Sequence, residues 1–210
     1  MSATGRSDVR DPADYYATPA WATHRLLERV ELPAGRWLEP CAGEGAIIQA
    51  TQAVRGDVAW TALEVRAECR EPLHDLRVES VQIGSFTAPT LPLLHAAYDV
   101  VLTNPPYRVA LAFARRALEL APVVALLLRL NWLASAKRAA WMHAHTPSIF
   151  VLPDRPSFVG GHGDATEYAW LVWGLYAVPT VEILATTPKT ERNGSPERER
   201  GQLELLERTA

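Results

Sequence analysis

Cysteine is scarce in this chain, and its scarcity narrows the possible chemistry. The 210 residues include two cysteines, Cys41 and Cys69. Two thiols do not make a disulfide framework, and the six histidines show no metal-ligand grouping with them or with carboxylates. We therefore expect a protein that holds no metal and works in a reducing cytoplasm.

Long apolar runs are missing as well. The longest, Ala121 to Leu128, is interrupted by Pro122 and closed by Arg129. It is too short and too broken for a membrane span. The N-terminus, Met1 to Asp14, is polar and lacks the apolar core of a signal peptide. The sequence thus predicts no membrane partner.

An excess of positive charge is also lacking. The chain has 21 lysines and arginines against 24 aspartates and glutamates, a net charge of -3. A dedicated nucleic-acid binder is usually strongly basic. Any contact with nucleic acid is therefore expected to be a local, salt-sensitive patch.

No repeat, low-complexity linker or domain boundary divides the middle of the chain. The length suits one domain with a sizeable core. We expect a flexible arm over residues 1–14, a single domain over 15–186, and a charged, loose tail over 187–210. A short helix is possible within that tail, from Gln202 to Arg208.

Short apolar runs alternate with helical patterns between these ends. Seven runs predict strands: 36–39, 59–64, 81–83, 99–103, 123–130, 149–152 and 168–173. Five patterns predict helices: 19–30, 46–54, 67–76, 110–120 and 135–143. The alternation favours an α/β fold with a mostly parallel seven-stranded sheet and helices on both faces, and the last two strands predict an antiparallel hairpin at the sheet edge. Ligands on such a sheet bind beyond the carboxyl ends of the strands.

A glycine loop follows the first predicted strand, within the segment Leu38 to Gly45. Gly43 and Gly45 allow a tight turn and a close approach of the backbone to a ligand. Glu39, at the strand end, suits the ammonium group of an amino acid, and two carboxylates, Glu39 and Glu44, disfavour a phosphate. The loop therefore favours a cationic cofactor that carries an amino acid; the alternative is an ordinary glycine turn.

Two later strand ends carry further candidates for the cofactor. Glu64 lies about 20 residues after Gly43, where nucleotide-type sites place the acid that binds the ribose hydroxyls. Phe86, in Gly84-Ser85-Phe86 after the third strand, suits the face of an adenine ring. The alternatives are a surface glutamate and a core aromatic residue.

The fourth predicted strand runs directly into Asn104-Pro105-Pro106-Tyr107. Two prolines give a stiff segment that cannot continue a ladder. An aromatic amino group is a poor nucleophile, because its lone pair is delocalised into the ring. The Asn104 side-chain oxygen and the Pro105 carbonyl, aimed at its hydrogens, favour a pyramidal nitrogen and stabilise the developing positive charge. Tyr107 is expected to stack on a base, which must be flipped out of any duplex; the alternative is a proline-rich turn.

Taken in this order, the motifs resemble those of the amino-directed DNA methyltransferases, specifically the small adenine-N6 type common in phages and mobile elements. The resemblance covers roughly residues 14–174. It includes the upstream segment Tyr15 to Pro19, and the segments Arg155 to Phe158 and Glu167 to Trp173, which resemble a terminal hairpin. It implies a Rossmann-like class I methyltransferase fold, S-adenosylmethionine (SAM) as cofactor, and N6 of adenine in DNA as target, in a bacterial or phage-infected cell.

The resemblance also implies roles for individual residues. The catalytic residues are Asn104, Pro105, Pro106 and Tyr107. The residues implied to bind the cofactor are Tyr16, Thr18, Pro19, Glu39, Pro40, Cys41, Ala42, Gly43, Gly45, Glu64, Val65, Ser85, Phe86 and Asn104. The substrate-binding candidates, which flank the proposed pocket or end a strand on its ligand side, are Tyr107, Arg108, Trp132, Arg155 and Phe158.

The sequence departs from the family at two points and leaves several alternatives open. Ser85 stands where the family often has an acidic residue near the adenine, and we expect no separate target-recognition domain among these residues. The same catalytic motif also occurs in enzymes that methylate a protein glutamine or an amino group of ribosomal RNA. Cytosine N4 is a further alternative target, because it is also an aromatic amino nitrogen with a delocalised lone pair. A non-catalytic DNA-binding relative is a further alternative, whereas Ile48 in place of a third glycine disfavours a nicotinamide-dependent oxidoreductase. The oligomeric state stays open.

Overall fold

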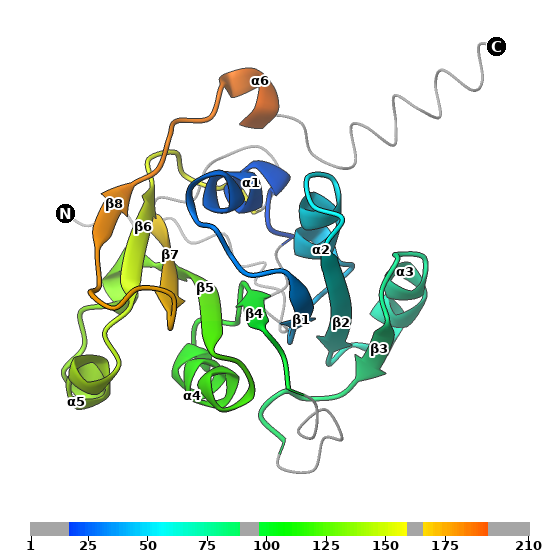
Figure 1. The fold of residues 1–210 in the computed structure, drawn as a ribbon, viewed down its shortest axis with the longest axis horizontal. Helices are drawn as coiled ribbons and strands as arrows, with labels where there is room; N and C mark the ends of the chain where they lie inside the picture. Colours follow the sequence, from blue (N-terminus) through cyan, green and yellow to red (C-terminus); the bar gives the residue numbers. More distant parts are fainter. Residues whose placement is uncertain (1–16, 89–96, 159–165, 193–210) are drawn as a thin grey trace, which may run out of the picture.

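The computed structural model describes residues 17–88, 97–158 and 166–192. Within them eight strands form one sheet, in the order β3-β2-β1-β4-β5-β7-β6-β8 (Figure 1). The strands are β1 Gly35–Glu39, β2 Val58–Glu64, β3 Ser80–Ile83, β4 Val100–Thr103, β5 Val123–Arg129, β6 Ser148–Leu152, β7 Tyr168–Trp173 and β8 Val181–Ile183. The predicted arm, Tyr16 and the helix from Gln202 to Arg208 lie outside the described residues.

The first five strands run parallel, and β7 reverses direction. β7 pairs antiparallel with both β5 and β6, with Leu126 opposite Leu171 and Phe150 opposite Trp170. The α/β fold with a mostly parallel sheet and a late antiparallel hairpin is therefore confirmed. All six residues of β7 are buried, because this strand lies between two neighbours and under helices on both faces.

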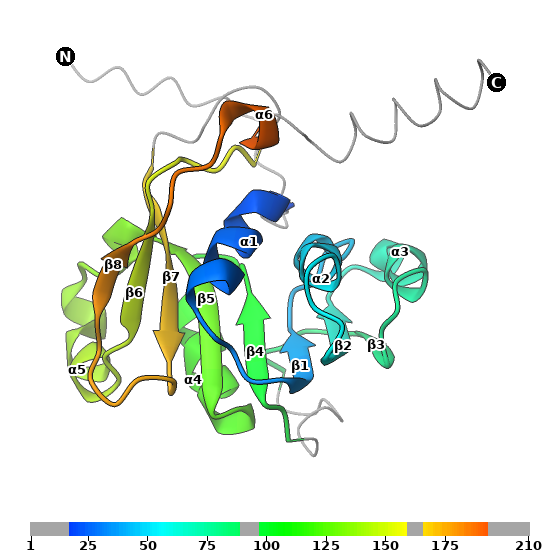
Figure 2. The same ribbon diagram turned by 45° about the horizontal axis from the view of Figure 1, so that its top comes forward.

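Helices cover both faces of the sheet (Figure 2). They are α1 Ala20–Arg29, α2 Ala46–Gln52, the short turn η1 Ala67–Cys69 with α3 Arg70–His74, α4 Ala110–Leu120, η3 Leu130–Trp132, α5 Ala136–Ala144 and α6 Lys189–Arg192. α1, α2 and α3 pack on one face through Leu26, Ile48 and Leu73. α4 packs on the other face through Phe113 and Ala117.

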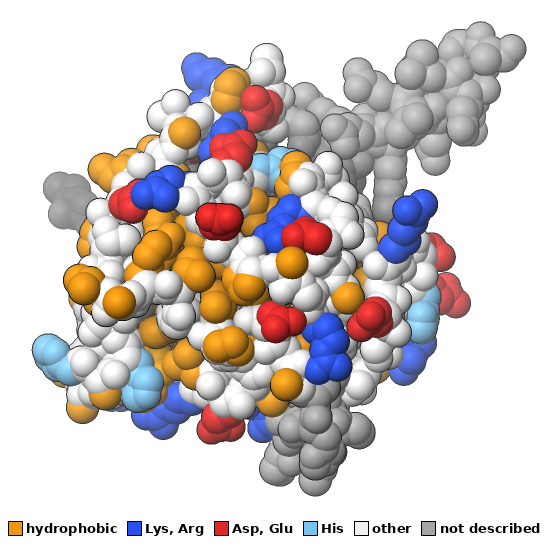
Figure 3. Space-filling view, in the orientation of Figure 1, with side chains coloured by type: hydrophobic (Ala, Val, Ile, Leu, Met, Phe, Trp, Pro, Cys, Tyr) orange, Lys and Arg blue, Asp and Glu red, His pale blue; other side chains and the backbone are white. Residues whose placement is uncertain are grey.

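The strand count departs from the prediction of seven. β8 pairs parallel with β6, with Ile149 beside Val181 and Val151 beside Ile183, so the hairpin is not at the edge of the sheet. The prediction missed β8 because it is three residues long and its two apolar side chains, Val181 and Ile183, are 68% and 75% exposed. Hydrophobic side chains gather on this side of the molecule in Figure 3, where β8 and β6 lie in Figure 1.

Ordered contacts continue past residue 186, the predicted end of the domain. The backbone N–H of Thr187 donates to Asp154 Oδ2 at 2.5 Å, and Arg192 pairs with the other oxygen of Asp154 at 2.7 Å. Glu191 pairs with Arg25 of α1 at 3.0 Å. Residues 187–192, expected to begin the loose tail, are thus held against α1 and the loop after β6.

Within the described residues, no helix is long and apolar enough to cross a membrane. The same residues hold no group of three or more histidine, cysteine, aspartate and glutamate side chains arranged to bind a metal ion.

Candidate active site

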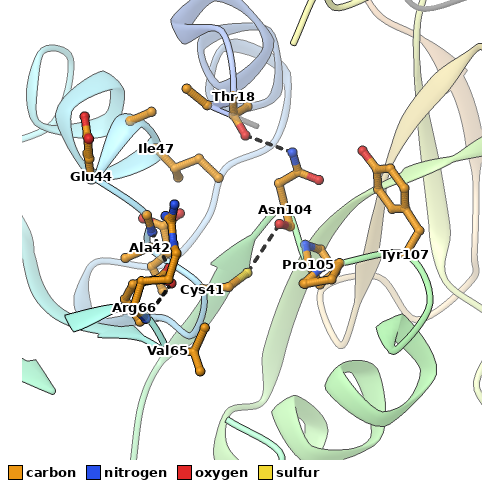
Figure 4. Close-up of a pocket in the computed structure, with 16 residues that line it drawn as sticks. Thr18, Cys41, Ala42, Glu44, Ile47, Val65, Arg66, Asn104, Pro105 and Tyr107 are labelled. Carbon is orange, nitrogen blue, oxygen red and sulfur yellow. Dashed lines mark hydrogen bonds and ion pairs between the residues drawn. The ribbon is translucent and has the colours of Figure 1, made fainter. Parts of the chain in front are cut away.

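One pocket lies at the carboxyl ends of β1, β2 and β4 (Figure 4). These are the strand ends at which the sequence placed Glu39, Glu64 and Asn104. The pocket is lined by Ala17, Thr18, Glu39, Cys41, Ala42, Gly43, Glu44, Ala46, Ile47, Glu64, Val65, Arg66, Asn104, Pro105, Pro106 and Tyr107. The fold therefore brings the upstream segment, the glycine loop, the second strand end and the catalytic motif to one place.

The glycine loop adopts the tight turn that its composition predicts. Gly43 and Gly45 have φ angles of 56° and 85°, in the region that favours glycine. A Cβ atom on Gly45 would lie 2.2 Å from the Leu76 side chain, so this glycine lets the turn pack closely against the end of α3. The Gly43 N–H donates to Glu64 Oε2 at 2.7 Å, which ties the loop to the end of β2.

Glu39 places an unpartnered acceptor in the pocket. The residue is 2% exposed, and among the described residues its Oε2 atom has no hydrogen-bond partner. Burial, and secondly the charge of Glu64, hold the pKa of the Glu39 carboxyl well above its usual value, although a backbone bond from Ile48 opposes the shift. A buried carboxyl that lacks a donor is suited to a cationic ligand, since a cation supplies both the charge and the hydrogen bonds.

Glu64 is buried at the end of the neighbouring strand, β2, and its carboxylate already accepts several hydrogen bonds. Besides Gly43, its Oε1 accepts from the backbone N–H of Arg66 at 3.1 Å and from Arg66 Nε at 3.0 Å. Arg66 is thereby folded back over the end of β2 and lines the pocket. The two carboxylates thus differ: Glu64 is neutralised by an arginine, and Glu39 has no such partner in the described part of the chain.

Asn104 is held by its backbone and by its side chain. The Cys41 thiol donates to the Asn104 carbonyl at 3.3 Å and lies 2.8 Å from the Thr103 hydroxyl. The side-chain Nδ2 of Asn104 donates to Thr18 Oγ1 at 3.1 Å. Burial raises the pKa of the Cys41 thiol above its usual range, and the nearby charges of Glu39 and Glu64 add to the rise, which disfavours the nucleophilic thiolate form.

The two prolines shape the turn after Asn104. The Val109 N–H donates to the Pro106 carbonyl at 3.0 Å, and the Asn104 carbonyl accepts from Cys41. Among the described residues, no hydrogen bond occupies the Pro105 carbonyl between them. The turn therefore keeps one backbone acceptor available beside the Asn104 side chain.

Tyr107 belongs to an aromatic cluster at the mouth of the pocket. The Arg129 guanidinium lies over its ring, with Cζ 4.9 Å from the centroid. Arg129 Nε also donates to the hydroxyl of the buried Tyr168 at 3.1 Å. Phe158 packs edge-on against Tyr168 with centroids 5.1 Å apart. Tyr107 is thus supported from one side by a fixed arginine, and Phe158 belongs to the same cluster.

Several predicted site residues lie outside the pocket lining. Phe86 is 3% exposed and packs on Phe113 of α4 with centroids 4.9 Å apart, so it takes the core position that was the alternative. Trp132 is buried beneath Arg138, whose Cζ lies 4.6 Å from its ring centroid. The other residues that do not line the pocket are Pro19, Pro40, Gly45, Ser85, Arg108, Arg155 and Phe158.

Other lining residues were not among the predicted site residues. They are Ala17, Glu44, Ala46, Ile47 and Arg66. Ala46 and Ile47 belong to the first turn of α2, directly after the glycine loop, so their place follows once the loop is known. No local sequence pattern predicts Arg66 as a pocket residue, because it lines the pocket only when its side chain folds back and bonds to Glu64.

Comparison with known proteins shows the fold. No family model and no curated protein sequence matches the chain. A Listeria monocytogenes protein assigned to the class I SAM-dependent methyltransferases superposes with a TM-score of 0.59 at 11% identity, covering 95% of this chain and 73% of that one. A Pyrococcus horikoshii protein assigned as an RNA methyltransferase superposes with a TM-score of 0.57 at 16% identity, covering 81% of this chain and 90% of that one.

A third structure, from Agrobacterium tumefaciens, is assigned as an O-methyltransferase. It gives a TM-score of 0.58 at 18% identity, covering 86% of this chain and 93% of that one. The three neighbours share one architecture, yet one is assigned as an RNA methyltransferase and another as an O-methyltransferase. The chain therefore has the class I methyltransferase fold, and its chemistry has to be argued from its own site.

Proposed function

We propose that this protein is a SAM-dependent methyltransferase that acts on an exocyclic amino nitrogen of a nucleobase, with N6 of adenine in DNA as its target. The observation that carries the proposal is the position of the Asn104 amide and the Tyr107 ring at the mouth of a pocket that ends on Glu39 and Glu64. One side of the pocket suits a cationic nucleoside and the other an aromatic amine.

The residues present fit SAM. The buried, unpartnered Oε2 of Glu39 gives an amino-acid ammonium group an acceptor, and the bound cation favours loss of the carboxyl proton, which supplies the negative charge. Gly43, with a positive φ and no side chain, lets the backbone approach a ligand closely, and Glu64 ends β2 where the ribose acid of a nucleotide site is placed. Val65, beside it, is 61% exposed and offers an apolar surface to an adenine ring.

When bound, SAM supplies an activated methyl group on a sulfonium. The protein's part is to make an amino nitrogen nucleophilic and to aim it. Asn104 Oδ1 and the Pro105 carbonyl accept hydrogen bonds from the two amino hydrogens, which draws the nitrogen away from planarity and stabilises the positive charge that develops on it. Tyr107 holds the ring by stacking, and this fixed orientation supplies much of the rate through positioning.

The choice of DNA adenine rests on the resemblance of the upstream segment, Ala17 to Pro19 in the described residues, and of Arg155 to Phe158. Two features of this structure support a flipped base as the target. Phe158 joins the cluster of Tyr107 and Tyr168, and Arg129 stacks on Tyr107. The exposed Arg108 follows Tyr107 directly and suits a phosphate. A stacking platform with an adjacent cation favours a nucleobase over a glutamine side chain.

The test is a methylation assay of the purified protein with SAM and a panel of acceptors. The panel holds unmethylated double-stranded and single-stranded DNA, ribosomal RNA and a release-factor protein, and the products are identified by mass spectrometry. We expect N6-methyladenine in DNA. Asn104→Ala should lower transfer roughly 100-fold or more while it still binds SAM in calorimetry. Asn131→Ala, an exposed asparagine outside the pocket lining, is the matched control.

Each other outcome identifies a different function. Methyl transfer to RNA or protein alone rejects DNA as the substrate and keeps the amino chemistry. N4-methylcytosine changes the base. Binding of SAM and DNA without transfer to any acceptor supports the non-catalytic relative, and full activity of Asn104→Ala contradicts the proposed role of the motif.

A further inference from the structure

The outer edge of β8 carries exposed apolar side chains. β8 is the last strand in the sheet order and lies at the outer edge of the sheet (Figure 1). Val181 and Ile183 are 68% and 75% exposed, and Tyr176 and Val178, just before the strand, are exposed as well. Single exposed apolar residues are ordinary on a protein surface. A group of them within one short segment indicates a surface that contacts a partner.

The backbone of β8 presents hydrogen-bonding groups along the same edge. The Thr180 carbonyl accepts from the Ile149 N–H, and the Leu184 N–H donates to the Val151 carbonyl, both at 2.8 Å. These residues of β8 therefore direct their backbone groups toward β6. Because the direction alternates along a strand, the N–H and C=O groups of Val181 and Ile183 point away from the sheet. Among the described residues no strand pairs with them, and such an edge is a template for a further strand.

The two faces of β8 differ in chemistry. Glu182 lies on the face that α1 covers, where Arg29 donates to both oxygens of its carboxylate at 2.6 and 2.7 Å. Side chains alternate between the faces of a strand, so Val181 and Ile183 lie on the opposite face. There they stand beside two partly buried apolar residues of β6. An apolar strip on one face thus lies behind an ion pair on the other.

This pattern is complementary to itself when two copies of the strand run antiparallel about a two-fold axis at Glu182. Val181 of each copy then lies opposite Ile183 of the other, and apolar side chains meet on one face. In this register the outward backbone groups of the same residues exchange hydrogen bonds. A shift of the register by two residues keeps hydrogen bonds but leaves one of the two apolar residues without an apolar partner.

The same register places the two Glu182 carboxylates next to each other on the α1 face. Like charges directly opposite one another destabilise a strand pair. Each carboxylate is already held by an arginine of its own copy, so the two Arg29–Glu182 pairs together form a network without net charge. The edge is therefore complementary to a second copy in charge as well as in shape.

We propose that β8 is a dimerisation edge, at which a second copy of this chain pairs antiparallel through Val181 to Ile183 and joins the two sheets into one. The two-fold symmetry closes the interface and prevents further growth at this edge. Pro179, which has no N–H, ends the pairing on one side. The interface is short, so we expect a weak dimer with a dissociation constant on the order of 10 to 100 µM. This inference goes beyond the proposed function and does not depend on it.

Sedimentation velocity of the full chain, from about 1 to 500 µM, measures the assembly. Val181→Lys places a charge in the apolar strip and should raise the dissociation constant of the dimer roughly tenfold or more. Val54→Lys is the matched control, because Val54 is 56% exposed and follows α2, away from β8. The same substitution there should leave the dimer unchanged. Thermal melts of both variants identify any loss that comes from misfolding.

A disulfide tests the register without disturbing the apolar strip. In the proposed pair the two Glu182 Cα atoms are about 4.5 Å apart, within the range that a disulfide spans. Glu182→Cys should therefore form an intermolecular disulfide on mild oxidation. Val178→Cys, which is 77% exposed but lies outside the paired segment, should not. The natural chain is the blank, because Cys41 is partly buried and Cys69 is buried.

The charge network can be tested separately. Arg29→Met leaves the two Glu182 carboxylates opposite each other without their cations, and the dimer should weaken roughly two- to fivefold. Addition of Glu182→Gln removes the repulsion and should restore the natural dissociation constant. Loss of the dimer in both the single and the double variant would contradict the proposed pairing of the two carboxylates.

Three results would overturn the inference. They are a natural chain that stays monomeric up to about 500 µM, a dimer that folded Val181→Lys leaves intact, and equal cross-linking of Glu182→Cys and Val178→Cys. If Val181→Lys does not fold, the disulfide decides. None of these measurements involves methyl transfer, so failure of the inference leaves the proposed function untouched.

Discussion

Arg66 and Glu64 form a double contact at the end of β2. The backbone N–H and the Nε atom of Arg66 both donate to Glu64 Oε1, at 3.1 and 3.0 Å. A carboxylate oxygen accepts about two hydrogen bonds, so Oε1 has no position left for a ribose hydroxyl. The Arg66 side chain therefore occupies an acceptor that a bound nucleoside needs.

Removal of this side chain should tighten cofactor binding. In Arg66→Ala Glu64 Oε1 keeps only the backbone hydrogen bond from residue 66 and regains one position for a ribose hydroxyl, and the pocket loses a positive charge that opposes a cation. A partly exposed ion pair is worth about 1 kcal/mol, so we expect the dissociation constant of SAM to fall roughly fivefold, measured by calorimetry. Arg70→Ala, an exposed arginine on the same segment, makes the same change in net charge and is the control. Weaker binding in Arg66→Ala would mean that the guanidinium contacts the cofactor.

Glu39 should make the stability of the protein depend on pH. Burial, followed by the charge of Glu64, raises its pKa well above the usual 4.5, so the folded chain keeps a proton that the unfolded chain has lost. The proton's stabilising effect is complete below pH 4.5 and is lost as the pH rises through the folded pKa. In Glu39→Gln this position does not titrate, so the variant does not lose this stability. Between pH 4.5 and the folded pKa, the free energy of unfolding of the variant minus that of the natural chain should therefore grow by up to about 1.4 kcal/mol per pH unit.

Urea unfolding at a series of pH values between 4.5 and 8 measures this difference. Glu31→Gln, an exposed glutamate in the loop before β1, controls for loss of a surface charge. Parallel pH profiles of Glu39→Gln and the natural chain would show that Glu39 is ionised throughout.

Arg129 should support catalysis through Tyr107. Its guanidinium lies 4.9 Å from the Tyr107 centroid, and Arg129→Met removes both the cation and the bond to Tyr168. A cation–π contact is worth about 0.5 to 2 kcal/mol, so kcat/KM for DNA should fall roughly three- to tenfold while SAM affinity stays unchanged. Arg36→Met removes a comparable arginine at the far end of β1, 5.8 Å from the Tyr98 ring centroid, and should leave both quantities unaltered. An equal loss in the two variants would assign the effect to general stability.

The sequence predicted the sheet well because most of its strands are buried. β5 and β7 are runs of apolar residues that pack on both faces, and such runs stand out from the polar loops around them. The same logic placed Glu39, Glu64 and Asn104 together, since the carboxyl ends of parallel strands meet at one edge. β8 gave no comparable signal, because its apolar side chains are exposed.

The contacts within the site were less accessible to prediction. Nothing near Phe86 in the sequence says that it turns toward Phe113 of α4 and not toward the pocket. Likewise the bond from Arg66 to Glu64 depends on a local reversal of the Arg66 side chain. The bond from Asn104 to Thr18 joins side chains that are far apart in the sequence. Residue type and spacing indicate which groups reach a site, and packing decides which of them touch.

The segment after β8 should contribute to stability up to Arg192. Asp154 has a side chain that is 12% exposed, and it receives hydrogen bonds from the Thr187 backbone and from Arg192. A chain that ends at Thr186 loses both and leaves a partly buried carboxylate without partners, which costs about 1 to 3 kcal/mol. A chain that ends at Arg192 keeps them. Urea unfolding should therefore separate the two truncations, with the longer one more stable and Asp154→Asn, in the longer chain, intermediate. Equal stability of both truncations would place the end of the folded domain at residue 186.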